Sequence, residues 1–557
     1  MRREFIVKSI LGAAGLLAGC AQSKDPAFPA TVGAKKGVWI DAHAHIFNAE
    51  DLDTFGYVEH GEGDSAVKRY AFTLLSPLLK TLCATIHRIA PGIQRESWLL
   101  DRMIEKRQRK MQERQTDGRR DPRKLAQSLI ADIHEIDPLH QQQVQQLDRE
   151  LQRCLHGNEI KVDPDNNPLR RVMPWLARQI APSFISCLAN YRIYNALKLI
   201  ANYPDVDAFV VANLDTDLWY RFYGPTYKLG EKMMQQAQVM SKIAILTEGR
   251  ILPRTGFCPL RQALSVYAPD QSVASPLEVV KCAVHHFGSI GAKLYPVVGY
   301  RPLGNRFMTN RELSELPMVD IQKALRDKPE WAGAAAKLKS DTDFTIGEEI
   351  DRALRQLYDT CVEHGISVMA HTNRSWGPTS FMNRVAPGWW KQLAEAYPKL
   401  RVNLAHFCGF GNGRNAYADL KKAEQYGPGV GWPEEAARDL FRKEFPHVYA
   451  DFSCITPTKT VESDFVGLLQ DHPLAGRRLM YGSDWHEVLF PGGAPNYLND
   501  WTKMFAPGRP LAPHAADFLG GNAVRFHGLA EGQVRDRLKE FYGKNGVKPG
   551  WWDKVRA

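Results

Sequence analysis

The most constraining feature of this 557-residue sequence is a repeated alternation of short apolar runs with helical patterns. The apolar runs are suited to buried strands. Strand alternating with helix indicates parallel strands joined by crossover helices, and eight such units favour a closed (β/α)8 TIM barrel over an open sheet. The fold class expected is therefore α/β. The eight runs are residues 37–41, 208–214, 250–252, 290–295, 366–370, 402–405, 448–452 and 479–482.

Two long stretches interrupt this alternation. Residues 50–203, between the first two strands, have helical patterns throughout, and a connection of this length must have its own structure. Residues 301–345 follow the fourth strand. Both would emerge at the C-terminal face of the barrel, where active sites are made. We therefore expect a barrel over 37–529 with a helical cap inserted after strand one, and a helical extension over 530–557.

The N-terminus has the order of a secretory signal. Arg2 and Arg3 precede an apolar stretch that is too short to span a bilayer, and Leu-Ala-Gly-Cys ends it at Cys20. This ending resembles a bacterial lipobox, in which the cysteine is lipidated. The implied division is a signal peptide over 1–19, lipidation of Cys20 and a tether over 20–36. The protein would then be a membrane-anchored lipoprotein of the bacterial envelope, periplasm-facing or at the cell surface, in the outer membrane where one is present.

The formal net charge of +10 is compatible with anionic partners or with a basic solvated surface. Residues 102–124 hold ten basic and four acidic side chains, which indicates either a solvated helix face or a contact with an anionic membrane or polymer. Nucleic acid is disfavoured, because export removes that partner and no recognition motif accompanies the charge.

Metal-ligating side chains recur at the ends of the predicted strands. His43 and His45 directly follow the first strand, and alternate residues of a strand point the same way. Lys293, His371, His406 and Asp484 end or directly follow strands four, five, six and eight. Because a parallel barrel gathers these ends over one mouth, we expect one site. Neutral imidazoles suit zinc, iron, cobalt, nickel or copper.

These motifs resemble the amidohydrolase superfamily, especially the branch related to aminocarboxymuconate-semialdehyde decarboxylase. The resemblance lies in Ile-Asp-Ala-His-Ala-His, Gly-Ala-Lys-Leu-Tyr-Pro, Val-Met-Ala-His-Thr, Asn-Leu-Ala-His-Phe and Tyr-Gly-Ser-Asp-Trp. Gly-Gly-Asn-Ala-Val-Arg at 520–525 is similar to the segment that closes these barrels. The resemblance as a whole covers most of residues 37–48 and 206–529, and it does not include the helical insertion.

The resemblance implies a divalent metal, Zn²⁺ first, with Fe²⁺, Mn²⁺ or Co²⁺ as other choices. Its ligands would be His43, His45, His371 and Asp484, with a position left for water. The metal would lower the pKa of that water towards about 7. His406 would orient or deprotonate the water or polarise a carbonyl, and Asp484 would also shuttle a proton.

Lys293 allows two interpretations. In binuclear relatives a lysine at strand four is carboxylated and bridges two metals, whereas in many single-metal relatives it is not. One metal is favoured. A small-molecule substrate, including a carboxylate, would be bound by residues after strand ends. The candidates are Arg254, Arg301, Asn373, Arg374 and Trp376; salt bridges that hold long loops are the other use of the arginines.

Three functions follow from these patterns. The first is metal-dependent hydrolysis of an amide, ester or lactone by an activated water. The second is metal-dependent decarboxylation of an unsaturated carboxylic acid at the same site. The third is a non-catalytic envelope binding protein, which is disfavoured because every expected ligand position carries a competent residue.

Overall fold

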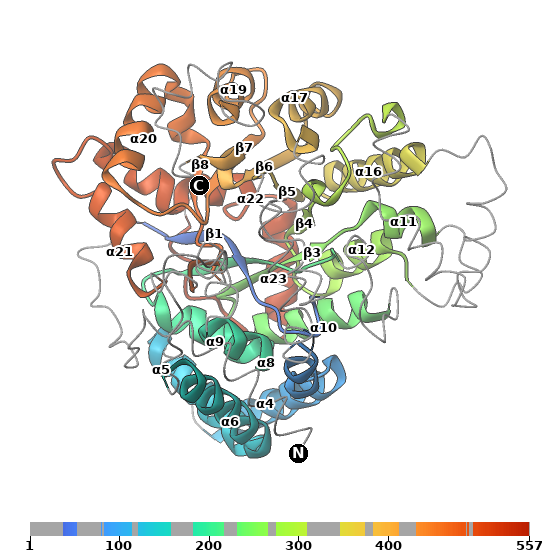
Figure 1. Cartoon of the computed structure of the whole chain (residues 1–557), viewed down its shortest axis with the longest axis vertical. Helices are drawn as coiled ribbons and strands as arrows, with labels where there is room; N and C mark the ends of the chain where they lie inside the picture. Colours follow the sequence, from blue (N-terminus) through green and yellow to red (C-terminus); the bar gives the residue numbers. More distant parts are fainter. Residues whose placement is uncertain are drawn as a thin grey trace, which may run out of the picture.

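Eight parallel strands form one sheet in the order β1 to β8, surrounded by helices (Figure 1). The computed structural model describes residues 37–52, 80, 83–113, 121–156, 182–216, 231–265, 274–308, 346–373, 383–410, 431–485, 487–489 and 494–555. Nearly every strand residue is buried, as expected where helices cover a parallel sheet. The strands are β1 Ile40–His45, β2 Ala208–Ala212, β3 Ile251–Gly256, β4 Gly291–Leu294, β5 Ser367–His371, β6 Arg401–Ala405, β7 Val448–Phe452 and β8 Leu479–Tyr481.

Backbone contacts between β1 and the end of β8 bring the first and last strands together. The N–H groups of Ser483 and Asp484 both donate to the His43 carbonyl, at 3.1 and 2.7 Å. The Asp41 carboxylate accepts from the N–H of Ser483 at 3.0 Å. The structure therefore confirms the TIM barrel, and each of the eight predicted runs overlaps a strand.

The segment 520–525 lies at the opposite end of β1. It runs from a π-helical turn (η11, Asp517–Gly521) into α22 (Asn522–His527). A Cβ on Gly520 would lie 1.9 Å from the Val38 carbonyl oxygen, so only glycine allows this approach. The Asn522 side chain donates to the carbonyls of Gly476 and Leu479, which precede or begin β8. This segment thus packs across the N-terminal ends of β1 and β8.

The helices between strands begin where local chemistry favours them. At α12 (Pro276–His286), Ser275 and Glu278 form a capping box, and proline occupies the first helical position. The other helices after β2 are α10 Glu231–Leu246, α11 Pro259–Ser265, α16 Ile346–Glu363, α17 Pro387–Ala396, α19 Trp432–Leu440, α20 Lys459–Asp471, α21 Ala494–Met504 and α23 Gln533–Lys544.

Besides a helical segment over 83–89, five helices occupy the described parts of the connection between β1 and β2. In Figure 1, α4, α5 and α6 form a layer outside the barrel, with α8 and α9 nearer to the strands. A buried ion cluster joins them: Arg192 on α9 donates to Asp51 at 2.6 and 2.7 Å and to Glu96 on α4 at 2.6 Å. The five are α4 Ile93–Glu113, α5 Pro122–Ile136, α6 Pro138–His156, α8 Pro182–Ala189 and α9 Arg192–Asn202.

Several sequence predictions fall on other parts of the chain. The signal, Cys20 and the whole tether (20–36) lie outside the described residues, and so do residues 309–345 of the second insertion. Within the described ranges, no helix is long and apolar enough to cross a membrane.

Candidate metal centre

Two histidines of β1 form one side of the candidate site. His43 and His45 are both buried, and their Nε2 atoms lie 3.1 Å apart. The Nδ1 atom of His45 lies 2.9 Å from the Ala212 carbonyl oxygen. A carbonyl only accepts hydrogen bonds, so this nitrogen carries the proton and Nε2 keeps a lone pair.

Asp484 and two further histidines complete the site. Asp484 Oδ1 lies 3.4 Å from His45 Nε2 and 3.9 Å from His43 Nε2. Asp484 Oδ2 lies 3.8 Å from His406 Nδ1, and His406 Nε2 lies 3.1 Å from His371 Nδ1. The barrel therefore brings together these five of the six side chains that the sequence placed at strand ends.

His43, His45 and Asp484 form the tightest part of this group. Each offers one ligand atom, and the three atoms lie within 4.8 Å of one another. The His371 ring packs against the His406 ring, with the two ring centroids 4.5 Å apart. A second triplet that meets the same distance limit consists of His43, His406 and Asp451.

Burial controls the electrostatics of this centre. It lowers the pKa of His43 to about 4 and of His406 to about 3, helped in both cases by neighbouring cationic groups. Burial also raises the pKa of Asp484, and Glu487 adds to this. Neutral imidazoles with converging lone pairs and a carboxylate disfavoured by burial are the donor set that a divalent cation stabilises. The residues present therefore fit a metal ion.

Lys293 lies inside the same group. Its Nζ atom is 3.0 Å from His43 Nε2 and 5.2 Å from the centre of the Tyr295 ring. Burial lowers the pKa of Lys293 to about 7, against the attraction of Asp451 and Asp484. The structure thus places this amine in contact with a ligand candidate.

The backbone is strained where the strands deliver these groups. His406, Cys454 and Asp484 follow β6, β7 and β8 with φ values of 63°, 55° and 52°. Residues other than glycine rarely adopt this left-handed region, and such strain clusters at functional sites.

A cavity of about 60 Å³ opens onto the centre. His45, His371, His406 and Asp484 form its polar floor. Among the described lining residues there is no lysine or arginine. The other lining side chains are Phe47, Leu52, Leu214, Thr216, Tyr295, Val297, Val298 and Glu487.

The predicted substrate-binding residues lie elsewhere or outside the described part. Arg254 is fully buried inside the barrel, where it donates to the Ser367 hydroxyl at 2.7 Å and to its carbonyl, so it does not line the cavity. The Arg301 guanidinium lies 4.3 Å from the centre of the Trp389 ring. Asn373 is half-buried and follows β5 without lining the cavity. Arg374 and Trp376 are outside the described residues.

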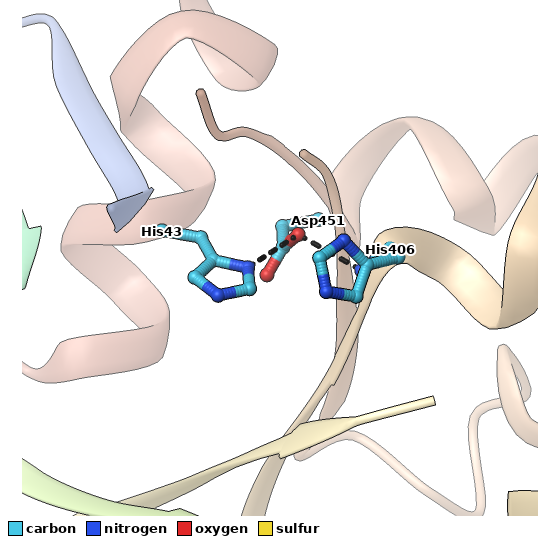
Figure 2. Close-up of side chains that lie close together, drawn as sticks. All are labelled: His43, His406 and Asp451. Atoms are coloured by element: carbon cyan, nitrogen blue, oxygen red, sulfur yellow. Dashed lines mark hydrogen bonds and ion pairs between the residues drawn. The ribbon is translucent and has the colours of Figure 1, made fainter. Parts of the chain in front are cut away.

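Sequence reasoning missed two residues on β7 and directly after it. Asp451 and Ser453 are fully buried. Figure 2 shows Asp451 beside His43 and His406. Asp451 Oδ1 lies 3.2 Å from His43 Nδ1 and accepts from the His406 N–H at 3.1 Å. Burial alone would raise the pKa of Asp451, but His43 and further hydrogen bonds hold it below its ordinary range. A carboxylate inside the apolar run 448–452 was the available signal.

Comparison with known proteins gives one family match. Residues 261–529 match the family model described as Amidohydrolase. Over these residues the chain is similar to amidohydrolases, which supports an enzyme of that type. His43 and His45 precede the matched range, so the β1 part of the site lies outside it.

No curated protein matches the chain. Among solved structures, an amidohydrolase II matches at 12% identity, 60% of this chain, 88% of that chain and a TM-score of 0.35. An uncharacterized TIM-barrel protein from Bordetella bronchiseptica matches at 14% identity, with 66% of this chain and 92% of that chain covered and a TM-score of 0.35. Manganese-bound 5-carboxyvanillate decarboxylase from Novosphingobium aromaticivorans matches at 12% identity, with 61% of this chain and 83% of that chain covered and a TM-score of 0.34. Likeness at this level carries no argument about the reaction.

Proposed function

We propose that this chain is a metal-dependent hydrolase that acts on an uncharged ester, lactone or amide with apolar groups beside the carbonyl. One divalent ion, zinc in the first place, would be held by His43, His45, His371 and Asp484. The observation that carries this proposal is the convergence of buried imidazole and carboxylate donors on the floor of one cavity. When bound, such an ion polarises a carbonyl group and lowers the pKa of a water.

The side chains around the ion would divide the remaining work. His406 lies 3.1 Å from His371 and lines the cavity, so it can orient a water there and accept its proton. Asp484 also lines the cavity and faces His45, which allows it to bind the ion; it lies 3.8 Å from His406, so it can take over the proton from that imidazole and pass it to the leaving group. Phe47, Leu52 and Val298 would exclude bulk water from this step.

The composition of the cavity wall supports an uncharged substrate. Its described acidic residues are Asp484 and Glu487, and none of its described residues is a lysine or arginine. A substrate carboxylate would normally be bound by such a cation. The assays must therefore distinguish hydrolysis of an uncharged substrate from the alternative, decarboxylation of an unsaturated carboxylic acid.

The test combines elemental analysis with two assays on the purified chain from residue 21 onwards. We expect about one zinc, iron or manganese ion per chain, lost in the His43→Ala/His45→Ala variant. His286→Ala is the matched control, because this histidine is exposed on α12. Release of acid from esters, lactones or amides supports hydrolysis. Release of carbon dioxide from unsaturated acids, with no acid released from esters, lactones or amides, contradicts it. Absence of metal after reconstitution contradicts both.

The number of metal ions per chain, measured by elemental analysis, also tests the role of Lys293. We propose that it remains an ammonium or amine in contact with His43. Two ions per chain, reduced to one or none in Lys293→Ala, would instead show that this lysine is carboxylated and bridges two metals.

We also propose that the chain is exported and anchored by lipid at Cys20. The lipobox-like Leu-Ala-Gly-Cys ending of the signal supports this proposal. Labelled fatty acid should be incorporated by the wild type and not by Cys20→Ala, and the variant should leave the membrane fraction. Equal membrane association of both proteins contradicts the anchor.

A further inference from the structure

The hydroxyl of Ser453 lies at the meeting point of three buried groups. Its Oγ atom is 2.8 Å from His43 Nδ1 and 2.9 Å from His406 Nδ1. It also forms a short hydrogen bond with Asp451 Oδ1. Ser453 therefore touches one proposed metal ligand and the proposed proton acceptor at the same time, in both cases at the Nδ1 atom of the imidazole.

Counting protons fixes the direction of these bonds. Asp451 Oδ1 accepts from the backbone N–H groups of His406 and Ser453, at 3.1 and 3.2 Å, and its Oδ2 accepts from the Asn403 amide at 2.6 Å. The carboxylate is thus an acceptor, and the single hydroxyl hydrogen of Ser453 goes to it. The two lone pairs of Oγ are then left to accept from His43 and His406.

Two further contacts require the same proton positions independently of Ser453 Oγ. His43 Nδ1 also lies 3.2 Å from Asp451 Oδ1, and His406 Nδ1 lies 3.3 Å from the Ser453 carbonyl oxygen. Both partners only accept hydrogen bonds, so both Nδ1 atoms must carry hydrogen. Each imidazole then presents its Nε2 lone pair on its other side, towards His45 for His43 and towards His371 for His406.

We infer that Ser453 is a positioning residue that sets the tautomers of His43 and His406 together. One hydroxyl orients the ligand and the proton acceptor, so that His43 presents Nε2 to His45 and His406 presents Nε2 to His371. This inference rests on the proposed function for the presence of the ion, and it adds a residue to which no role has been given.

The same hydrogen positions explain why His43, His406 and Asp451 lie close together without a second metal. Ser453 Oγ bonds to all three members, and the hydrogens on both Nδ1 atoms point at oxygen acceptors. A cation placed there would face N–H groups rather than lone pairs. The structure therefore assigns this triplet to orientation of the histidines.

The test measures binding of Co²⁺ alone to the metal-free chain, by its visible absorption in competition with a chelator. Ser453→Ala should raise the Kd by about 10- to 100-fold, the usual cost of losing a partner behind a metal ligand. Ser453→Thr keeps the hydroxyl and should bind within about threefold of the wild type on the same ground. Ser453→Val has the shape of threonine without the hydroxyl and should behave like alanine. Ser241→Ala, in the buried face of α10, is the control for loss of a buried serine.

The outcomes separate the inference from the function on which it rests. Failure of the wild type to bind Co²⁺ contradicts the metal-dependent function itself. Wild-type binding with equal affinity in folded Ser453→Ala, or equal loss in the threonine and valine variants, overturns the inference alone. Thermal unfolding of each metal-free variant gives the fold check. If only the variants without a hydroxyl fail to fold, the hydroxyl serves the fold and the inference is wrong.

Discussion

Two clusters of buried polar side chains differ in their composition, one in the helical insertion and one at the mouth of the barrel. In the helical insertion, Arg192 donates to Asp51 and Glu96, and Glu96 accepts in addition from the Ile193 N–H at 2.9 Å. At the barrel mouth, His43 Nε2 instead faces His45 Nε2 at 3.1 Å and Lys293 Nζ at 3.0 Å. In the first cluster opposite charges meet; in the second, nitrogen faces nitrogen.

The difference separates a group that stabilises the fold from one that is arranged for a ligand. Buried charges persist in a fold when partners compensate them, as they do around Arg192. The nitrogens of the mouth have pKa values shifted by burial, and their lone pairs converge, so they gain compensation from a cation. Removing the metal should therefore affect only the mouth, whereas removing Arg192 should affect the fold.

The largest expected effect is that of metal removal. Chelation should lower activity by at least about 1000-fold, because the ion polarises the reacting group, and addition of zinc should restore it. At an ion concentration 100 times the Kd, binding should stabilise the folded chain by about 2.7 kcal/mol. Activity and thermal midpoint are measured before and after chelation. The midpoint of the His43→Ala/His45→Ala variant should not respond, and unchanged wild-type activity after chelation would remove the distinction between the clusters.

Arg192→Met should have the next largest effect, on stability. It leaves Asp51 and Glu96 buried without their cation, which costs about 3–5 kcal/mol. Unfolding in urea measures the loss. Arg102→Met is the control, because this arginine pairs with Glu105 on the exposed face of α4 and should change stability by less than about 1 kcal/mol. A similar small change for both variants would contradict a structural role for the Arg192 cluster.

Asp451→Asn should have an intermediate effect, on the mouth. The amide can no longer accept at every contact with His43, His406 and Ser453, so the imidazoles lose their fixed orientation. Metal affinity should fall by about 10- to 100-fold. Asp207→Asn is the matched control: it is buried, and it accepts from Trp39 and Lys554 at the other end of β1. Equal metal affinity in both variants would show that Asp451 does not support the ligands.

The sequence predicted the barrel because its apolar runs and helical patterns repeat in one order, which is a local signal. It also predicted His43, His371 and Asp484 at one mouth, since the ends of parallel strands must gather. The roles of Arg254 and Ser453 could not be read in the same way. Arg254 points into the barrel towards Ser367, and Ser453 gains meaning only from His43, which is 410 residues away. Both depend on side-chain direction and on contacts distant in sequence.

The smallest expected effect concerns a histidine of the insertion, His140 on α6. It is fully buried against the Tyr191 ring, and burial lowers its pKa to about 4, with Arg95 adding to this and Asp137 opposing it. A histidine with a lowered pKa binds its proton more readily in the unfolded chain, so stability falls as the pH drops below about 6.5 towards 4. Between pH 7 and 5.5 the wild type should lose about 1 kcal/mol more than His140→Phe, which keeps the ring contact. Urea unfolding of the metal-free proteins at both pH values measures this difference. An equal loss in both proteins would mean that His140 does not carry the acid sensitivity of the insertion, and that the buried histidines of the two regions differ less than their surroundings indicate.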